Sequence, residues 1–219
     1  MTVTSLLSAT ELFEDLDPET IDRLSSDATE HTLRRGDVLF AEGDEPGSLF
    51  VVSSGRIAIA NKSVDGRESV VALMESGDLF GEMALFDGLG RSAEARALEQ
   101  SVVVSIPYAP IRDLYERRPD QLWRVVRLLA SRIRTMDEAL ADAVFLDVTG
   151  RTAKRLLELA GDNDEFVLPI TQEELAGMVG ASRERVNKAI AQFIKLGWIH
   201  QIDRRYVITN RRQLEIRAR

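Results

Sequence analysis

Residues 80–93 read Phe-Gly-Glu-Met-Ala-Leu-Phe-Asp-Gly-Leu-Gly-Arg-Ser-Ala. Gly81 opens a short apolar turn of helix, Glu82 follows at once, and Arg91-Ser92 comes nine residues after that carboxylate. The first N–H groups of a helix attract anions, and Gly81 has no Cβ to keep one away. Arg91 adds a charge-assisted fork and Ser92 a hydroxyl donor. Glu82 repels phosphate but accepts from a sugar hydroxyl. Each residue alone fits a turn with a solvated arginine, but together they predict a nucleotide site.

The composition excludes several classes of protein. The 219 residues are enough for two domains, and no stretch approaches the roughly 18 to 20 apolar residues of a membrane span. The first five residues, Met-Thr-Val-Thr-Ser, show no secretory signal, so we expect a cytoplasmic protein. Cysteine is absent, which excludes disulfides and Cys-ligated metal clusters. With only His31 and His200, a histidine-rich metal site is not expected.

The net charge of −8 is unevenly distributed. Residues 145–219 hold 13 Lys+Arg against 10 Asp+Glu, whereas residues 1–144 hold 15 against 26. The carboxyl-terminal part is therefore basic and the rest acidic. This asymmetry is modest, but it has the sign expected for a chain that binds nucleic acid through its tail.

The first half of the chain reads as a helical segment followed by many short strands. Residues 5–27 show helical spacing, with Asp17 as N-cap before Pro18. From about Glu30 to Pro107, β-prone runs alternate with Gly/Asp turns such as Asp65-Gly66. This texture predicts an antiparallel sandwich or barrel. The runs are Val38–Phe40, Leu49–Val52, Arg56–Ala60, Ser69–Leu73 and Val102–Ile106.

The longest helical pattern follows Pro110 and Pro119. Apolar residues alternate at spacings of four and three, which is the seam of a helix that packs against a twin. We therefore expect a homodimer with the two long helices parallel. Off-seam residues Trp123, Val125 and Leu128 are predicted to pack on the chain's own barrel. The seam consists of Leu122, Val126, Leu129, Ile133, Met136, Leu140 and Ala143.

A second domain is predicted from residue 145, because residues 145–150 (Phe-Leu-Asp-Val-Thr-Gly) break the seam. A helix is expected over Thr152–Ala160 and a short extended piece over Leu168–Ile170. The division is thus 1–109 for the barrel, 110–144 for the long helix and 145–219 for the last domain, an α+β chain overall.

The last domain carries a helix-turn-helix pattern. Thr171 and Glu174 form a capping box, Gly180 takes the turn and Ser182 caps the second helix. We expect Leu175, Ala176, Val179, Val186 and Ile190 to face the core.

The exposed face of the second helix carries the residues expected to meet DNA. They are Arg183, Glu184, Asn187 and Lys188. Arginine reads guanine and glutamate accepts from cytosine in the major groove. The runs Trp198–Ile202 and Tyr206–Ile208 predict a β-hairpin wing, whose arginines, Arg204 among them, would touch phosphates.

Three motifs in this order resemble the Crp/Fnr family of bacterial transcription regulators, in particular actinobacterial cyclic AMP receptor proteins. They are Phe80-Gly81-Glu82 with Arg91-Ser92, residues 145–151 (Phe-Leu-Asp-Val-Thr-Gly-Arg) and residues 180–186 (Gly-Ala-Ser-Arg-Glu-x-Val). The resemblance covers nearly the whole chain. It implies a jelly-roll-like β-roll sensor, a dimerising helix and a winged helix-turn-helix. It also implies a palindromic site similar to TGTGA-n6-TCACA, with RNA polymerase as a partner and no membrane contact.

By this resemblance the ligand is cyclic AMP, an allosteric effector. Glu82 would accept from the ribose 2′-OH, and Arg91 with Ser92 would bind the cyclic phosphate, beside Gly81 and Met83. Arg132 resembles the family's arginine that pairs with the socket glutamate. Thr171, Ser182, Arg183, Glu184, Asn187, Lys188 and Arg204 are the residues expected at the DNA.

The chain departs from the family at Met136-Asp137, where relatives usually carry Thr followed by Ser, Thr or Asn. Those groups receive the adenine amine, one from each subunit. Met136 is a weak acceptor, but an ionised Asp137 accepts only, which suits the adenine amine and opposes the guanine O6. Burial would raise the pKa of an unpaired carboxylate there. We expect adenine selectivity with altered affinity.

Two further interpretations remain beside this one. A regulator that answers to another nucleotide, or binds DNA without ligand, is kept open by Met136-Asp137. An enzyme of the cupin type needs clustered His and carboxylate ligands, which two isolated histidines do not supply. Oxygen sensing of the Fnr type is not expected, because the chain has no cysteine to bind an iron–sulfur cluster. No metal, haem or iron–sulfur cluster is expected.

Overall fold

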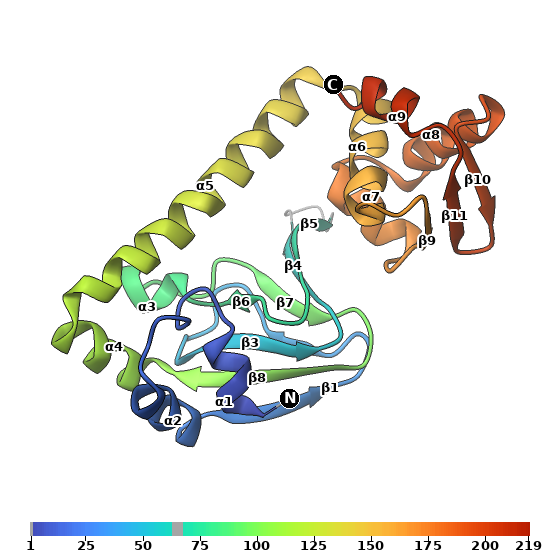
Figure 1. Ribbon diagram of the computed structural model, residues 1–219. Coiled ribbons are helices and arrows are strands. Elements are labelled where there is room, and N and C mark those ends of the chain that lie inside the picture. Colours follow the sequence, from blue (N-terminus) through green and yellow to red (C-terminus); the bar gives the residue numbers. More distant parts are fainter. Residues whose placement is uncertain (1, 63–67) are drawn as a thin grey trace. The chain divides into compact units, whose positions relative to one another are not determined.

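The computed structural model describes residues 2–62 and 68–219 (Figure 1). The predicted Asp65-Gly66 turn lies outside the described residues. The chain divides into two compact units, Met1–Ile133 and Arg134–Arg219. The long helix α5 (Leu122–Phe145) runs through this division.

The first unit is a β-roll with helices before, within and after it. Its strands form two antiparallel sheets, β1-β8-β3-β6 and β2-β7-β4-β5. Four of the five predicted β-prone runs lie wholly in strands, and the fifth, Arg56–Ala60, does so from Ile57 onward. This confirms the predicted architecture. Before α5 the elements are α1 (Val3–Ser8), α2 (Pro18–Ser26), β1 (Thr29–Leu33), β2 (Val38–Phe40), β3 (Ser48–Ser54), β4 (Ile57–Lys62), β5 (Glu68–Met74), β6 (Leu79–Phe80), α3 (Met83–Asp87), β7 (Glu94–Ala97), β8 (Ser101–Pro107), α4 (Tyr108–Arg117) and the 3₁₀ helix η1 (Pro119–Gln121).

The predicted helical segment at the amino end forms two helices, α1 and α2, with a turn between them. Leu12 and Phe13 lie in that turn and are buried, because the chain folds back there to bring both side chains into the core. Asp17 caps α2 as predicted, accepting from the amide of Thr20 at 2.9 Å. That hydrogen bond lowers the pKa of Asp17.

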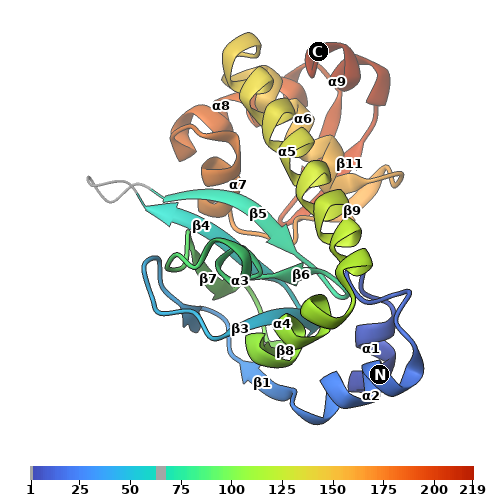
Figure 2. The ribbon, with the colours of Figure 1, turned by 90° about the vertical axis from the view of Figure 1, so that its left-hand side faces the viewer.

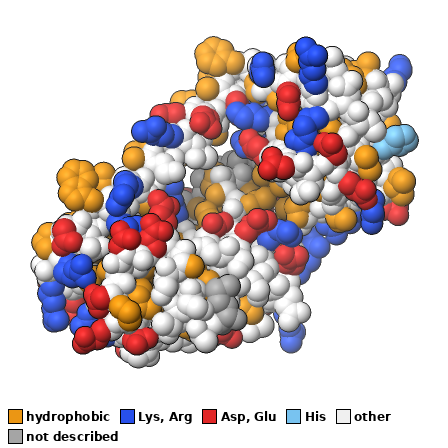
Figure 3. Space-filling view, in the orientation of Figure 1, with side chains coloured by type: hydrophobic (Ala, Val, Ile, Leu, Met, Phe, Trp, Pro, Cys, Tyr) orange, Lys and Arg blue, Asp and Glu red, His pale blue; other side chains and the backbone are white. Residues whose placement is uncertain are grey.

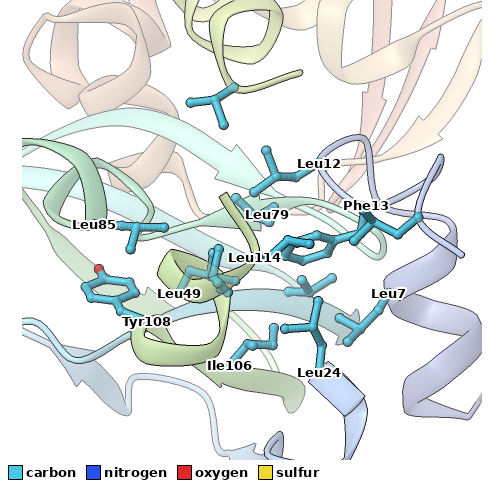
Figure 4. Close-up of a cluster of buried hydrophobic side chains, with 14 of the residues drawn as sticks. Leu7, Leu12, Phe13, Leu24, Leu49, Leu79, Leu85, Ile106, Tyr108 and Leu114 are labelled. Carbon is cyan, nitrogen blue, oxygen red and sulfur yellow. The ribbon is translucent and has the colours of Figure 1, made fainter. Parts of the chain in front are cut away.

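One hydrophobic core joins these helices to the sheet that contains β3 and β8. Leu7 and Phe13 pack with Leu49 of β3, Ile106 of β8 and Leu114 of α4 (Figure 4). Figures 1 and 2 show α1, α2 and α4 gathered beside that sheet. The amino-terminal helices therefore cover a sheet face that would otherwise be exposed.

A second cluster holds three aromatic rings beneath the predicted socket. The rings of Phe50 and Phe80 stack with centroids 5.4 Å apart, and Phe40 lies 5.6 Å from Phe50. These residues come from β3, β6 and β2. Strands of both sheets thus meet beneath the loop that follows β6.

The long helix α5 keeps its apolar seam on the surface. Val126, Ile133, Met136 and Leu140 are 50 to 69% exposed, and Figure 3 shows hydrophobic side chains on the surface over α5, among charged ones.

The barrel-facing side of α5 holds two of the three residues that were predicted for it. Val125 and Leu128 are buried, but the prediction for Trp123 was wrong because Trp123 is 69% exposed. A helix turns about 100° per residue, so Trp123 lies roughly 200° from Val125, on the opposite side.

The second unit is a helical domain with a small sheet, ordered β10-β11-β9. The predicted β-hairpin is present, but the extended piece predicted at Leu168–Ile170 was placed wrongly. The strand is β9, just before it, because Pro169 lacks an N–H for a sheet ladder. The elements after α5 are α6 (Val148–Ala160), β9 (Glu165–Val167), α7 (Gln172–Val179), α8 (Arg183–Lys195), β10 (Ile199–Ile202), β11 (Arg205–Ile208) and α9 (Arg211–Arg217).

Candidate functional site: a charged socket and a helix-turn-helix

The socket begins where β6 ends and the chain turns into α3. Gly81 has φ +77°, a conformation that side-chain-bearing residues rarely adopt. A Cβ at this position would also lie 2.7 Å from Nη1 of Arg91 and 3.3 Å from the ring of Phe50. Glycine is therefore required both by the backbone conformation and by the close approach of the arginine.

Glu82, the next residue, is fully buried and carries the negative charge of the socket. Its Oε1 accepts from Nη1 of Arg132, which confirms the predicted pairing, while Nη2 of Arg132 donates to the carbonyl of Leu79 at 2.5 Å. Among the residues that the structure describes, Oε2 of Glu82 has no hydrogen-bond partner. A buried carboxylate oxygen without a partner is costly, and a ligand hydroxyl would satisfy it.

Arg91 supplies the positive charge and is only 7% exposed. Its Nη1 donates to the carbonyl of Gly81 at 2.8 Å and to the hydroxyl of Tyr108 at 3.0 Å, and its Nη2 donates to the carbonyl of Ser48 at 2.7 Å. The guanidinium lies 4.2 Å from the ring centroid of Phe40, a cation–π distance. Its Nε is buried without a partner within the described part of the chain.

Ser92 and Met83 complete the described part of the socket. The hydroxyl of Ser92 is exposed and lies 3.7 Å from the sulfur of Met83, and Met83 is itself 48% exposed. A thioether is a weak acceptor, so this hydroxyl is available for a stronger partner. The structure thus brings Gly81, Glu82, Met83, Arg91, Ser92 and Arg132 to one place.

Three socket residues were missed by the sequence analysis, namely Ser48, Phe40 and Tyr108. Ser48 acts through its backbone carbonyl, and Phe40 and Tyr108 are ordinary core types, so none carries a sequence signal. Met136 and Asp137, expected at the adenine base, are exposed on α5. Their contact with a ligand stays a prediction.

The helix-turn-helix of the second unit is formed as predicted. Thr171 accepts from the amide of Glu174 at 3.1 Å, and Glu174 accepts from the amide of Thr171 at 2.6 Å, a capping box. Gly180 ends α7 at φ +67°, and Ser182 caps α8 through the amide of Arg185. The predicted core-facing residues are buried, namely Leu175, Ala176, Val179, Val186 and Ile190.

The outer face of α8 is charged and exposed. Arg183, Glu184, Asn187 and Lys188 are all exposed there, and Nζ of Lys188 lies 2.7 Å from Oε1 of Glu184. That hydrogen bond lowers the pKa of Glu184. A surface pair of this kind contributes little to stability, so both side chains are free to change partners.

A cavity of about 490 Å³ lies between the start of α7, the start of α8 and the wing. Thr171, Arg183 and Arg204 all line it, so three residues predicted at the DNA share one hollow. Nη2 of Arg204 donates to the carbonyls of Leu168 and Ile170 at 3.0 and 3.4 Å. Arg204 therefore ties the wing to the loop before α7, and its phosphate contact stays a prediction.

Residues 2–62 and 68–219 hold no group of three or more His, Asp or Glu that could bind a metal ion. Within the same ranges, no helix has the length and apolar content that crossing a membrane requires.

Comparisons with known proteins agree with both parts of the site. Residues 30–118 match the family model of the cyclic nucleotide-binding domain, and residues 150–217 match that of the Crp-like helix-turn-helix domain. The CRP-like cAMP-activated global transcriptional regulator of Mycobacterium tuberculosis is 36% identical over 221 residues, covering 98% of this chain and 99% of that protein.

Solved structures show the same architecture. FixK2 from Bradyrhizobium japonicum has a TM-score of 0.78 at 21% identity, over 86% of this chain and 96% of that chain, a likeness of fold alone. The c-di-GMP responsive global regulator CLP from Xanthomonas campestris has a TM-score of 0.76 at 26% identity, over 88% and 99%. The two matched domains and the full-length relative show that this chain belongs to the Crp/Fnr family of transcription regulators.

Proposed function

We propose that this protein is a homodimeric regulator that binds cyclic AMP in the socket and, in response, a palindromic operator similar to TGTGA-n6-TCACA. The observation that carries the proposal is a pair of buried orphan atoms, Oε2 of Glu82 and Nε of Arg91. One is an acceptor and the other a donor. A ribose hydroxyl and a cyclic phosphate oxygen are the groups that would satisfy them.

The cyclic phosphate would be held by Arg91 with Ser92, and the ribose by Glu82. Arg132 donates to Oε1 of Glu82, so Oε2 is the oxygen left to accept from a ribose hydroxyl. Because Arg132 lies on α5, the same ion pair connects the socket with the helix that carries the exposed seam. A ligand that hydrogen-bonds to Glu82 would therefore be connected to the dimerising helix through the ion pair between Glu82 and Arg132.

The dimer would form along the seam of α5. Val126, Ile133, Met136 and Leu140 are each at least half exposed, and a second copy of the helix would cover them. For two copies of α8 to enter successive major grooves, they must lie about 34 Å apart, one turn of DNA. Cyclic AMP would then favour the dimer state with that spacing.

Base selectivity is assigned to Asp137. Its carboxylate would accept from the adenine amine and disfavour the carbonyl of guanine, while Met136 contributes little as an acceptor. RNA polymerase is the further partner that a regulator of this family would contact.

Calorimetric titration of the purified protein tests this function. We expect cyclic AMP to bind one site per chain, with cyclic GMP about tenfold weaker or more, the value of one good hydrogen bond to a charged acceptor. Equal affinity for the two nucleotides, or no heat with either, would contradict the assignment.

A second candidate is a regulator of the same fold that answers to a different nucleotide. The observation that favours it is the likeness to CLP, a regulator described as responsive to c-di-GMP, together with Met136-Asp137. A titration with c-di-GMP in the same calorimeter separates the two. Binding of c-di-GMP without binding of cyclic AMP would favour this alternative.

A further inference from the structure

Tyr108 is a buried residue of the socket unit to which the proposed function gives no role. It is the first residue of α4 and is 5% exposed. Its amide donates to the carbonyl of Gly47 at 3.0 Å, and its ring lies at the edge of the hydrophobic core (Figure 4). The ring centroid also lies 5.9 Å from Cζ of Arg91. Main chain and ring are thus both fixed, and the hydroxyl makes the hydrogen bonds to the socket.

The hydroxyl of Tyr108 touches both ends of the socket. It accepts from Nη1 of Arg91 at 3.0 Å, and it donates to the carbonyl of Gly81 in a short hydrogen bond. Burial raises the pKa of Tyr108, so the phenol keeps the proton that it donates. A phenol has one donor and two acceptor positions, and both roles are used here.

The donors of Arg91 divide between the protein and the socket. A guanidinium has five N–H groups. Gly81 and Tyr108 take those of Nη1, and Ser48 takes one from Nη2. The Nε–H and one Nη2 hydrogen remain, and two N–H groups on neighbouring nitrogens are what a phosphate takes in a fork. The phenol therefore helps to determine which edge of the guanidinium is left for a ligand.

The same hydroxyl orients the peptide between Gly81 and Glu82. In a planar trans peptide, the C=O of Gly81 and the N–H of Glu82 point in opposite directions. Because Tyr108 and Arg91 both bind that C=O, they also fix the direction of the N–H and the start of the glutamate side chain. The phosphate end and the sugar end thus share one anchor.

We propose that Tyr108 is a positioning residue of the nucleotide site, acting through Arg91 to pre-orient the phosphate fork and through Gly81 to hold the ribose-binding glutamate. This inference rests on the proposed function. It gives Tyr108, in the first turn of α4, a role in nucleotide affinity, although this residue lies outside both the socket motif of residues 80–93 and the helix-turn-helix. Pre-orientation raises affinity by reducing the ordering that binding requires.

A double-mutant cycle with Tyr108→Phe and Arg91→Lys tests this role, since lysine keeps the charge but has no fork. Calorimetry with cyclic AMP, up to millimolar concentration, measures all four proteins, and thermal unfolding gives the folded fraction of each. We expect Tyr108→Phe to weaken binding about tenfold beside Arg91 but less than threefold beside the lysine, because the phenol acts through the guanidinium.

Tyr115→Phe is the matched control. Tyr115 lies on the same helix, and its buried hydroxyl has no hydrogen-bond partner among the described residues, so its removal should leave affinity unchanged. An equal loss in both backgrounds of the cycle, no loss at all, or a tenfold loss for Tyr115→Phe would overturn the inference while the proposed function stood. A wild-type protein that binds no cyclic AMP would overturn both.

Discussion

The two units differ in the burial of their candidate functional charges, which are buried in the first unit and exposed on α8 of the second. In the first unit, Glu82 and Arg91 are 0 and 7% exposed, and Arg91 has three hydrogen-bond acceptors from its own unit. On α8, the side chains of Glu184 and Lys188 are 77 and 75% exposed and bond to each other. A buried charge has one geometry before its ligand arrives, whereas an exposed one adjusts to what it meets.

This difference predicts where substitutions matter most. Removing one member of a buried charged set leaves its partners desolvated and unpaired, which is expensive. Removing an exposed charge costs the fold little and acts mainly on the partner molecule. Socket variants should therefore lose ligand affinity steeply, and variants on the exposed face of α8 should lose DNA specificity more than stability.

The largest effect is expected for Arg91→Ala. It removes the phosphate fork, the Nη2 donor to the carbonyl of Ser48 and one of the two donors to the carbonyl of Gly81, so cyclic AMP affinity should fall at least about a hundredfold. Calorimetry measures the loss, and Arg112→Ala, at an exposed position on α4, is the control that should bind normally. An unchanged response to cyclic AMP would show that the socket is assigned wrongly.

The next effect is expected on α8. Arg183→Ala should weaken binding to the palindrome about tenfold to a hundredfold, the range of one bidentate contact with a base, and change the melting temperature little. Fluorescence anisotropy with the operator and with a scrambled duplex measures both affinity and preference. Lys195→Ala, at the other end of the helix, should keep the preference. Equal weakening on both duplexes would show a phosphate contact instead.

A smaller effect is expected at the departure from the family. Asp137→Ala should reduce the ratio of cyclic AMP to cyclic GMP affinity about tenfold, because the acceptor for the adenine amine is lost. Asp137→Asn is the companion variant, since an amide offers both donor and acceptor and should accept either base. If neither substitution changed the ratio of cyclic AMP to cyclic GMP affinity, residues other than Asp137 would have to determine the base selectivity.

The smallest effect concerns the stability of the second unit. Asp147 caps α6 by accepting from the amide of Gly150 at 2.8 Å, and this bond, with a smaller effect from Arg217, lowers the pKa of Asp147. Because the pKa of Asp147 is lower in the folded state, its ionised carboxylate stabilises the fold at pH values above the pKa of the unfolded chain, about 3.9. Asp147→Ala should cost about 1 kcal/mol near neutral pH.

The pH dependence separates the charge of Asp147 from its capping role. The stability difference between wild type and Asp147→Ala should shrink as the pH falls from about 5 through the lowered pKa. Asp147→Asn keeps a capping oxygen but, like Asp147→Ala, has no carboxyl to titrate, so the stability difference between these two variants should stay constant as the pH falls. Chemical denaturation at several pH values measures this, and a difference that grows toward acid pH would contradict the assignment.

Sequence patterns predicted what local chemistry determines. The N-caps Asp17 and Thr171, the strands of the roll and the turn at Gly180 all depend on near neighbours, and all are present. The misplaced Leu168–Ile170 piece and the exposed Trp123 depend instead on which partner strand or helix face lies nearby. Patterns of a single segment do not contain that information.

The socket shows the same division. The sequence revealed four socket residues because their chemistry is distinctive at that spacing. They are Gly81, which lacks a Cβ, and the polar residues Glu82, Arg91 and Ser92. Tyr108 and the carbonyl of Ser48 were not, since Tyr108 directly follows β8 and Ser48 begins β3, and these two strands pair across the sheet. The groups that hold Arg91 are brought together by the pairing of β3 with β8, so a short sequence motif does not reveal them.

Coupling between the socket and α8 is tested by the affinity of the wild-type protein for a labelled TGTGA-n6-TCACA duplex with and without cyclic AMP, measured by anisotropy at fixed salt. Saturating cyclic AMP should tighten binding about tenfold or more, the scale of a typical allosteric coupling, and Arg91→Ala should remove this gain. Equal affinity with and without the nucleotide in a protein that binds cyclic AMP would contradict the coupling of socket and recognition helix.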